Sequence, residues 1–176
     1  MRKILLLLSA LTMALGLAAC SSKEEDKTEK KETKEASAPE IDVNKEMVKF
    51  YMNLGKKINA KDADLNSYEA AVAKEAEDPD IKIEPEQKTK ASESAAAVVA
   101  ELNSVQVPAS LKDQKADLEG AVKDFTTSYQ VKAEELKKDA PSFDAAEAAF
   151  TQGEKKLGKA YESVKLLPPS LGNQVN

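Results

Sequence analysis

The chain has 176 residues, of which 41% are hydrophobic, 32% charged and 5% aromatic, and 26 basic against 31 acidic residues give a formal net charge of −5. The absence of His and the single Cys exclude most nucleophilic and transition-metal chemistry, and an internal disulfide as well. Because the basic residues are interleaved with acidic ones and form no cluster, we also expect no nucleic-acid partner.

The first residues have the pattern of an export signal. Arg2 and Lys3 form a positively charged head, and the stretch 4–17 that follows is apolar apart from three small or polar residues. This stretch is shorter than the roughly 20 apolar residues that a membrane-spanning helix needs. It is therefore typical of a signal peptide.

The apolar stretch ends in Leu17, Ala18, Ala19 and Cys20, which resembles the lipobox of bacterial lipoproteins. The resemblance implies that Leu17, Ala18 and Ala19 are recognised by the signal peptidase, and that cleavage leaves Cys20 first, with a diacylglyceryl group on its thiol. Two or three acyl chains such as palmitate hold a chain on a membrane, since each buried methylene contributes about 0.8 kcal/mol. The alternatives are an ordinary secretory signal that precedes a cysteine, and a transmembrane anchor.

A highly charged segment separates the signal from the rest of the chain. Residues 21–40 contain five Lys and seven acidic residues, too little apolar surface to offset the entropy lost on ordering. We therefore predict three parts: a signal peptide over 1–19, the lipidated Cys20 with a disordered tether over 20–40, and a helical-bundle domain over 41–176.

Four stretches of that domain, within 47–72, 91–105, 111–136 and 143–167, repeat apolar residues at alternating spacings of three and four. This spacing keeps one face of a helix apolar, and only Lys61 interrupts the first stripe. No window shows the sustained alternation of a strand. The predicted fold class is all-α, an elongated antiparallel up-and-down four-helix bundle. We expect its packing energy to concentrate in the large side chains Tyr51, Tyr68, Phe125, Tyr129, Phe143 and Phe150.

Proline and capping residues indicate where the four helices begin and end. The sequence 78–80 ends the first helix, Pro85 begins the second, Ser110 caps the third and Ser142 caps the fourth. The pattern does not determine whether the first helix continues through residues 61–64.

One spacing suggests a metal. Asp62, Asp64 and Asn66 match the opening of an EF-hand calcium loop, but Ser67 stands where the loop needs Gly and Ala73 where it needs Glu. These residues fit a solvated helix face or a kink better. Di-metal sites of helix bundles need His, so we expect no bound metal and no cofactor.

Catalytic groups do not converge in the pattern. Glu134 and Glu135 are adjacent on one helix and point about 100° apart, whereas acid–base catalysis needs two converging carboxylates. Lys61, Lys115 and Lys132 occupy stripe positions, where a desolvated Lys can act as a nucleophile but a Lys at a bundle edge normally extends to water. We therefore expect no enzymatic activity.

Tyrosine and methionine leave a ligand site open. Met47 and Met52 are core-filling residues or, in principle, ligands of a soft metal. The four tyrosines lie on or beside the stripes, as core residues with hydroxyls at the rim or as the lining of a pocket between helices. They are Tyr51, Tyr68, Tyr129 and Tyr161.

The whole pattern loosely resembles small helical-bundle lipoproteins of Gram-positive bacteria, although Ser21 is also compatible with outer-membrane sorting in a Gram-negative cell. We expect the lipid on Cys20 to hold the chain on the extracytoplasmic face of the cell membrane. The leading hypothesis for its function is a non-catalytic protein-interaction module with an envelope or membrane protein as partner. The alternative is a small-molecule or metal-ion binding lipoprotein. A cavity of roughly several hundred Å³ between helices, lined by Tyr and Met, favours this alternative.

Overall fold

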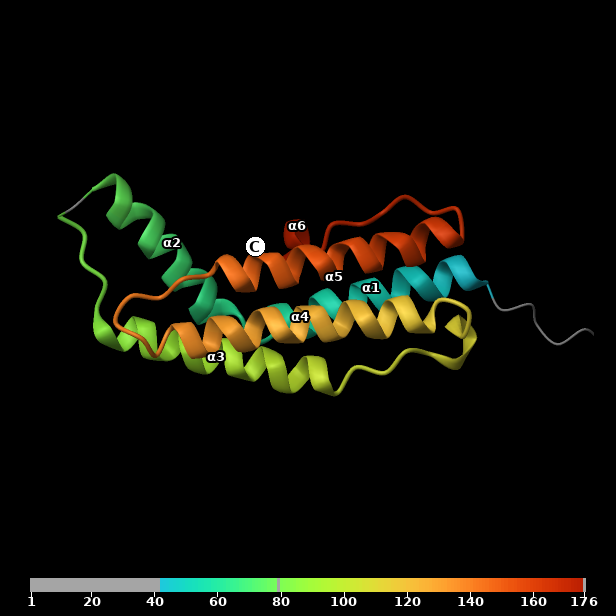
Figure 1. Ribbon diagram of the computed structural model, residues 1–176, viewed down its shortest axis with the longest axis horizontal. Helices are drawn as coiled ribbons and strands as arrows, with labels where there is room; N and C mark the ends of the chain where they lie inside the picture. The colour runs from blue at the N-terminus through green and yellow to red at the C-terminus, as the bar shows by residue number, and fades with distance from the viewer. Residues whose placement is uncertain (1–41, 79, 176) are drawn as a thin grey trace, which may run out of the picture. The chain divides into compact units, whose positions relative to one another are not determined.

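All regular secondary structure in the described part of the chain is helical. The computed structural model describes residues 42–78 and 80–175, and these contain no strand. Six α-helices follow one another, with one short 3-10 helix, Ala109–Leu111, before the fourth (Figure 1). They are α1 (Val43–Asn59), α2 (Ala63–Glu77), α3 (Pro85–Asn103), α4 (Lys115–Glu135), α5 (Asp144–Ser163) and α6 (Gly172–Val175). The predicted all-α class is confirmed, with six helices in these residues where four were predicted.

The first predicted helix is broken into α1 and α2. At the break, the N–H groups of Lys61 and Asp62 both donate to the carbonyl of Ile58, at 2.8 and 3.1 Å. Ser94 of α3 bridges the junction, because its hydroxyl donates to the Lys61 carbonyl at 2.5 Å and accepts from the Leu65 N–H at 3.3 Å. Buried backbone groups that leave a helix must find other partners. This contact from α3 therefore stabilises a break that the apolar spacing did not reveal.

The inner faces of the helices meet in one core. The predicted stripe of α3, from Ala91 to Leu102, has no exposed surface, and neither has Phe125 of α4. Tyr68 and Tyr129 are buried as expected. The other three large side chains lie half-buried at the edge of the core, and they are Tyr51, Phe143 and Phe150.

A glycine sets how closely α4 and α5 approach. A Cβ atom at Gly153 would lie 2.6 Å from Cε1 of the Phe125 ring, closer than any real carbon contact. The ring of Phe125 therefore occupies the space that a side chain at Gly153 would fill. The absence of a side chain at Gly153 therefore lets α5 approach the Phe125 ring of α4 closely.

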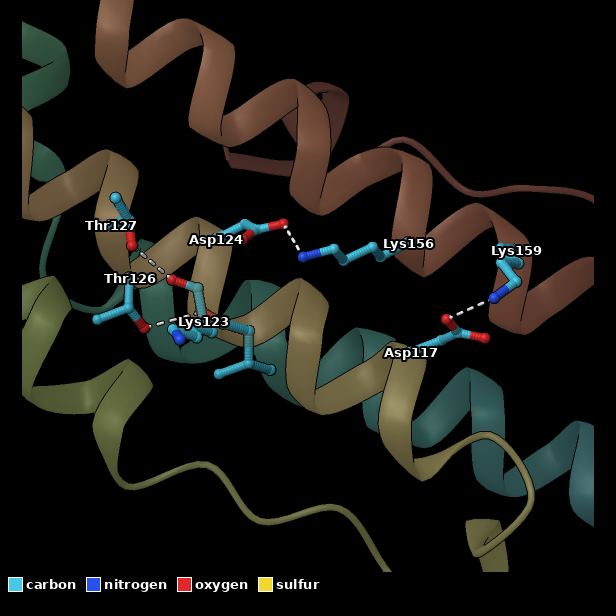
Figure 2. Close-up of polar contacts among 8 residues, drawn as sticks. Asp117, Lys123, Asp124, Thr126, Thr127, Lys156 and Lys159 are labelled. Atoms are coloured by element: carbon cyan, nitrogen blue, oxygen red, sulfur yellow. Dashed lines mark hydrogen bonds and ion pairs between the residues drawn. The ribbon is translucent and has the colours of Figure 1, made fainter.

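Ion pairs join the solvent side of the same two helices. Lys156 pairs with Asp124 at 2.7 Å, and Lys159 pairs with Asp117 at 2.9 Å (Figure 2). The Thr126 hydroxyl instead donates to a carbonyl of its own helix at 2.8 Å. Exposed pairs contribute about 0–1 kcal/mol each, so buried packing contributes more than these pairs to holding α4 against α5.

The chain reverses direction after α5, and its C-terminal residues form hydrogen bonds with α1 and α2. Lys165 has a φ of 62°, the left-handed conformation that reverses a chain at a helix end. The Tyr51 hydroxyl then donates to the Ser170 carbonyl at 2.8 Å, and the Asn66 amide donates to the Val175 carbonyl at 3.1 Å. The C-terminal residues thus contact both α1 and α2, an arrangement that the sequence analysis did not foresee.

Capping predictions are confirmed at one helix and wrong at two. α3 begins at Pro85 as predicted. Ser110 does not cap α4, because the segment around it forms a 3-10 helix that places Leu111 in the core. Ser142 does not cap α5 either, because the helix begins two residues later with Phe143 at the N-cap position. The Ser142 N–H donates instead to the Glu135 carboxylate at 3.1 Å.

We predict that Gly153→Ala destabilises the fold by about 1–3 kcal/mol, because the new methyl group must displace the Phe125 ring. Gly120→Ala is the matched control, since its Cβ meets mainly the flexible side chain of Lys156 and the change gains helix propensity of up to about 1 kcal/mol. Urea unfolding followed by far-UV circular dichroism measures both. Equal stability of the two variants would contradict the packing account.

Candidate functional site

The residues predicted to carry the lipid anchor lie outside the described part of the chain. Cys20 and the peptidase-recognition residues Leu17, Ala18 and Ala19 belong to this set, as do the predicted signal peptide and tether. The remaining candidates from the sequence analysis lie in the helical part, where side chains from three helices converge.

A groove opens between α2, α4 and the beginning of α5, where α2 is angled away from the other helices (Figure 1). Its volume is about 590 Å³, within the range of pockets that hold small molecules. Beyond Tyr68, α2 buries no side chain. The groove therefore follows from the direction that α2 takes after the break.

The walls of the groove are largely apolar. Val72 and Ala73 come from α2, while Phe143 lies directly before α5 and Phe150 in its second turn. The Phe150 ring packs on Phe125 with 5.0 Å between centroids, which anchors one wall in the core. Val72 was predicted to be buried on the first stripe, but 38% of it is exposed because no helix covers that part of α2.

An ion pair crosses the groove from α4 to α2. Lys132 Nζ lies 2.6 Å from Glu69 Oε1 and 5.8 Å from the centroid of the Tyr129 ring. The Lys132 side chain is 18% exposed, so this stripe lysine is largely withdrawn from water, whereas Lys61 and Lys115 are exposed. The ion pair therefore places a partly buried ammonium group and a carboxylate in contact across the groove.

Two further polar groups belong to the inner side of the groove. Ser128 has no exposed surface, and its hydroxyl has no hydrogen-bond partner in the described structure. Burial raises the pKa of the Tyr129 hydroxyl, and the negative charges of Asp62 and Glu69 raise it further. Tyr129 therefore stays protonated. A buried polar atom without a partner costs about 1–3 kcal/mol, and a bound molecule can satisfy it.

Asp62 is a buried carboxyl at the hinge between α1 and α2. Only 3% of the residue is exposed, and its Oδ2 has no hydrogen-bond partner. Burial is the main cause that raises the pKa of Asp62, and the nearby charge of Glu69 also raises it. Hydrogen bonds, including one from Asn66, and the charge of Lys132 act in the opposite direction.

The calcium spacing does not form a calcium loop. Residues 63–77 are helical, and the Asn66 amide is bonded to the C-terminal segment, while Asp64 is exposed and Asp62 is buried. Within residues 42–78 and 80–175, no three acidic or cysteine side chains are grouped so that they could hold a metal ion.

Other candidates from the sequence do not converge. Glu134 and Glu135 pair separately with Lys137 at 2.8 Å and Lys138 at 2.5 Å. Met47 is buried in the core and Met52 is exposed. A hollow of about 710 Å³ lies beside Met52, on α1 and the C-terminal segment. Its volume is larger than that of the groove, but no partly buried ion pair or aromatic side chain lines it.

Sequence reasoning identified part of this site and missed the rest. Lys132 was singled out because a charged residue stood on an apolar stripe, and Tyr129 as a possible pocket residue. Glu69, Ser128 and Glu147 were missed, since each fits an ordinary helix surface or core position. No local signal marks them, because they meet only when α2, α4 and α5 are brought together.

Comparisons with known proteins found no relative. No protein-family model matches the chain, and no curated protein or solved structure is significantly similar to it. None of the helices in the described part combines the length and hydropathy that crossing a bilayer requires. The functional interpretation of the groove therefore rests on its own side chains.

We predict that Asp62→Asn raises the melting temperature at about pH 7 and that this gain disappears towards about pH 4. Because the folded-state pKa of Asp62 is raised, the folded chain keeps a proton that the unfolded chain has lost. The contribution of Asp62 to stability is therefore greatest in acid and is lost as the pH rises through the folded pKa. Thermal unfolding at a series of pH values measures it.

Asp64→Asn is the control, since it makes the same change in charge at an exposed position of the same helix start. It should not give the rise in melting temperature at about pH 7 that Asp62→Asn gives. A melting temperature of Asp62→Asn that falls below that of the unsubstituted chain at neutral pH would contradict the account of a strained buried carboxylate.

Proposed function

We propose that this protein is a lipoprotein, anchored through Cys20 to the extracytoplasmic face of the cell membrane, whose helical domain binds a small organic molecule in the groove between α2, α4 and α5. This is the alternative hypothesis of the sequence analysis. The observation that carries it is the convergence of an ion pair, a buried hydroxyl without a partner and apolar walls on one groove of about 590 Å³.

The protein-interaction module has no comparable observation in its favour. Large apolar side chains with substantial exposure in the described residues are Val48, Met52, Val72 and Leu167. They lie on three separate segments, and Val72 already belongs to the groove, whereas a protein-binding surface normally needs a contiguous apolar patch. An envelope or membrane protein partner is therefore the second choice.

The proposed role is binding without catalysis. Lys132 is held by Glu69, and the adjacent pair Glu134 and Glu135 is engaged with separate lysines. These contacts engage three of the side chains that the sequence analysis considered for catalysis. The proposal includes no cofactor and no metal.

The arrangement of the chain belongs to the same proposal. It comprises a signal peptide over 1–19, the lipidated Cys20 and a tether over 20–40, and a domain over 41–176. We infer an up-and-down four-helix bundle in which α1 and α2 together take the place of the first helix. The packing of α3 against α2 and α4, and of α4 against α5, supports this interpretation.

The anchor predicts a defined modification. Mass spectrometry of the membrane-extracted protein should find Cys20 as the first residue, with a diacylglyceryl group on its sulfur. Cys20→Ala should remain unprocessed and unacylated, because no thiol is left to modify, while Ser21→Ala should still be processed. An unmodified Cys20 thiol in the mature protein would contradict the anchor.

The groove predicts binding that a single substitution blocks. We expect 2-phenylethanol, a neutral probe, to bind the full chain in detergent micelles by isothermal titration calorimetry. Ala73→Trp fills the groove and should weaken this binding at least about tenfold, which corresponds to about 1.4 kcal/mol. Ala70→Trp, on an exposed part of α2 outside the groove, should retain it and also corrects for partition into micelles. Equal binding by the two variants would contradict a ligand site in the groove.

A further inference from the structure

The side chains around the groove carry an excess of negative charge. Glu69 and Glu147 line it, and Lys132 is the sole cation among the described residues that do so. The buried Asp62 lies close enough for its charge to act on Tyr129 and Lys132. Lys132 is compensated by Glu69 at 2.6 Å, while no ion pair within the described residues involves Glu147 or Asp62. The side chains in and near the groove therefore carry a net negative charge.

The ammonium group of Lys132 shows which side chains bind a positive charge in this groove. It is held by a carboxylate at 2.6 Å and lies 5.8 Å from the centre of an aromatic ring. Both kinds of partner stabilise an ammonium group, the carboxylate through charge and the ring through its negative face. The protein's own side chain thus occupies one ammonium site.

The same two kinds of partner recur on the opposite wall. Phe143, Glu147 and Phe150 all line the groove. Phe143 is the N-cap residue of α5, while Glu147 and Phe150 are three residues apart within this helix and so lie on one face of it. Glu147 is exposed and the two rings are half-buried. This wall combines a carboxylate with two aromatic rings, the two kinds of group that hold Lys132.

We infer that the groove selects organic cations, with an ammonium group on an apolar body, over anions and neutral molecules of the same shape. The inference rests on the proposed function and names the chemical class of its ligand. The ammonium group is placed at Glu147 beside the rings of α5, and the apolar body against Val72 and Ala73. The partnerless hydroxyl of Ser128 adds one hydrogen-bonding group on the inner side.

An anionic ligand does not satisfy the same groups. The positive charge of Lys132 is already taken by Glu69, and an anion would have to displace that carboxylate. It would also approach Glu147 and lie near Asp62, both of which repel it. A neutral ligand gains the apolar contacts alone.

Three probes with the same phenyl-ethyl body test the selectivity: phenethylamine, which is a cation at neutral pH, 2-phenylethanol and 3-phenylpropionate. Each is titrated into the full chain in micelles by isothermal titration calorimetry. We expect phenethylamine to bind at least about tenfold more tightly than the other two. A high salt concentration should reduce this preference, because it screens the exposed carboxylate at Glu147.

Glu147→Gln tests the placement of the cation. This exposed substitution should remove most of the preference for phenethylamine over 2-phenylethanol. Glu134→Gln is the matched control, since it removes the same charge from α4 outside the groove. It should retain the preference, and circular dichroism should show that both variants are folded.

The outcomes separate this inference from the proposed function. Equal affinities for the three probes, or tightest binding of 3-phenylpropionate, would overturn cation selectivity while leaving a ligand groove. A preference that survives in Glu147→Gln would overturn recognition by Glu147. No binding of any probe up to about 10 mM, which corresponds to a very weak interaction, would overturn the ligand groove and this inference with it.

Discussion

Two hydrogen bonds of Ser94 stabilise the break between α1 and α2, after which α2 takes a different direction (Figure 1). The Ser94 hydroxyl of α3 donates to the Lys61 carbonyl and accepts from the Leu65 N–H. It thereby supplies partners to backbone groups at a break that interrupts an otherwise continuous apolar stripe. The chain changes direction at the break, so α2 is angled away from the other helices (Figure 1) and buries no side chain beyond Tyr68. A straight helix would have placed Val72 on the core stripe, and the groove depends on this bend.

The two sides of the groove are held by different kinds of interaction. The α4–α5 side rests on close packing, in which Gly153 admits the Phe125 ring and Phe125 supports Phe150. The α2 side is held across the groove by the ion pair of Lys132 and Glu69. Nearby, the fold keeps a carboxyl at Asp62 and a hydroxyl at Ser128 buried with unpaired oxygen atoms. Such locally unfavourable groups are more typical of binding sites than of cores selected for stability alone.

Much of the helical part could be predicted from the residues themselves, because apolar spacing reports directly on which face of a helix is buried. The stripe of Ala91, Ala95, Val98 and Leu102 is completely buried, and Pro85 begins its helix as expected. The caps at Ser110 and Ser142 were wrong because both helices begin further along the chain: Gln114 is the N-cap residue of α4, after the 3-10 helix that buries Leu111, and Phe143 is that of α5. The lipobox at Cys20 stays a prediction, since it lies outside the described residues.

The sequence by itself determined the all-helical class, most of the buried positions and the exclusion of His-dependent chemistry, since each follows from residue type and local spacing. Only the tertiary structure decided that residues 60–62 break a helix, that Val72 is uncovered, and that Glu69, Lys132 and Glu147 line one groove. Those features arise from side chains dozens of residues apart that satisfy or oppose one another in space. The spacing of apolar residues indicates which face of a single helix is buried. It does not indicate the direction that a neighbouring helix takes.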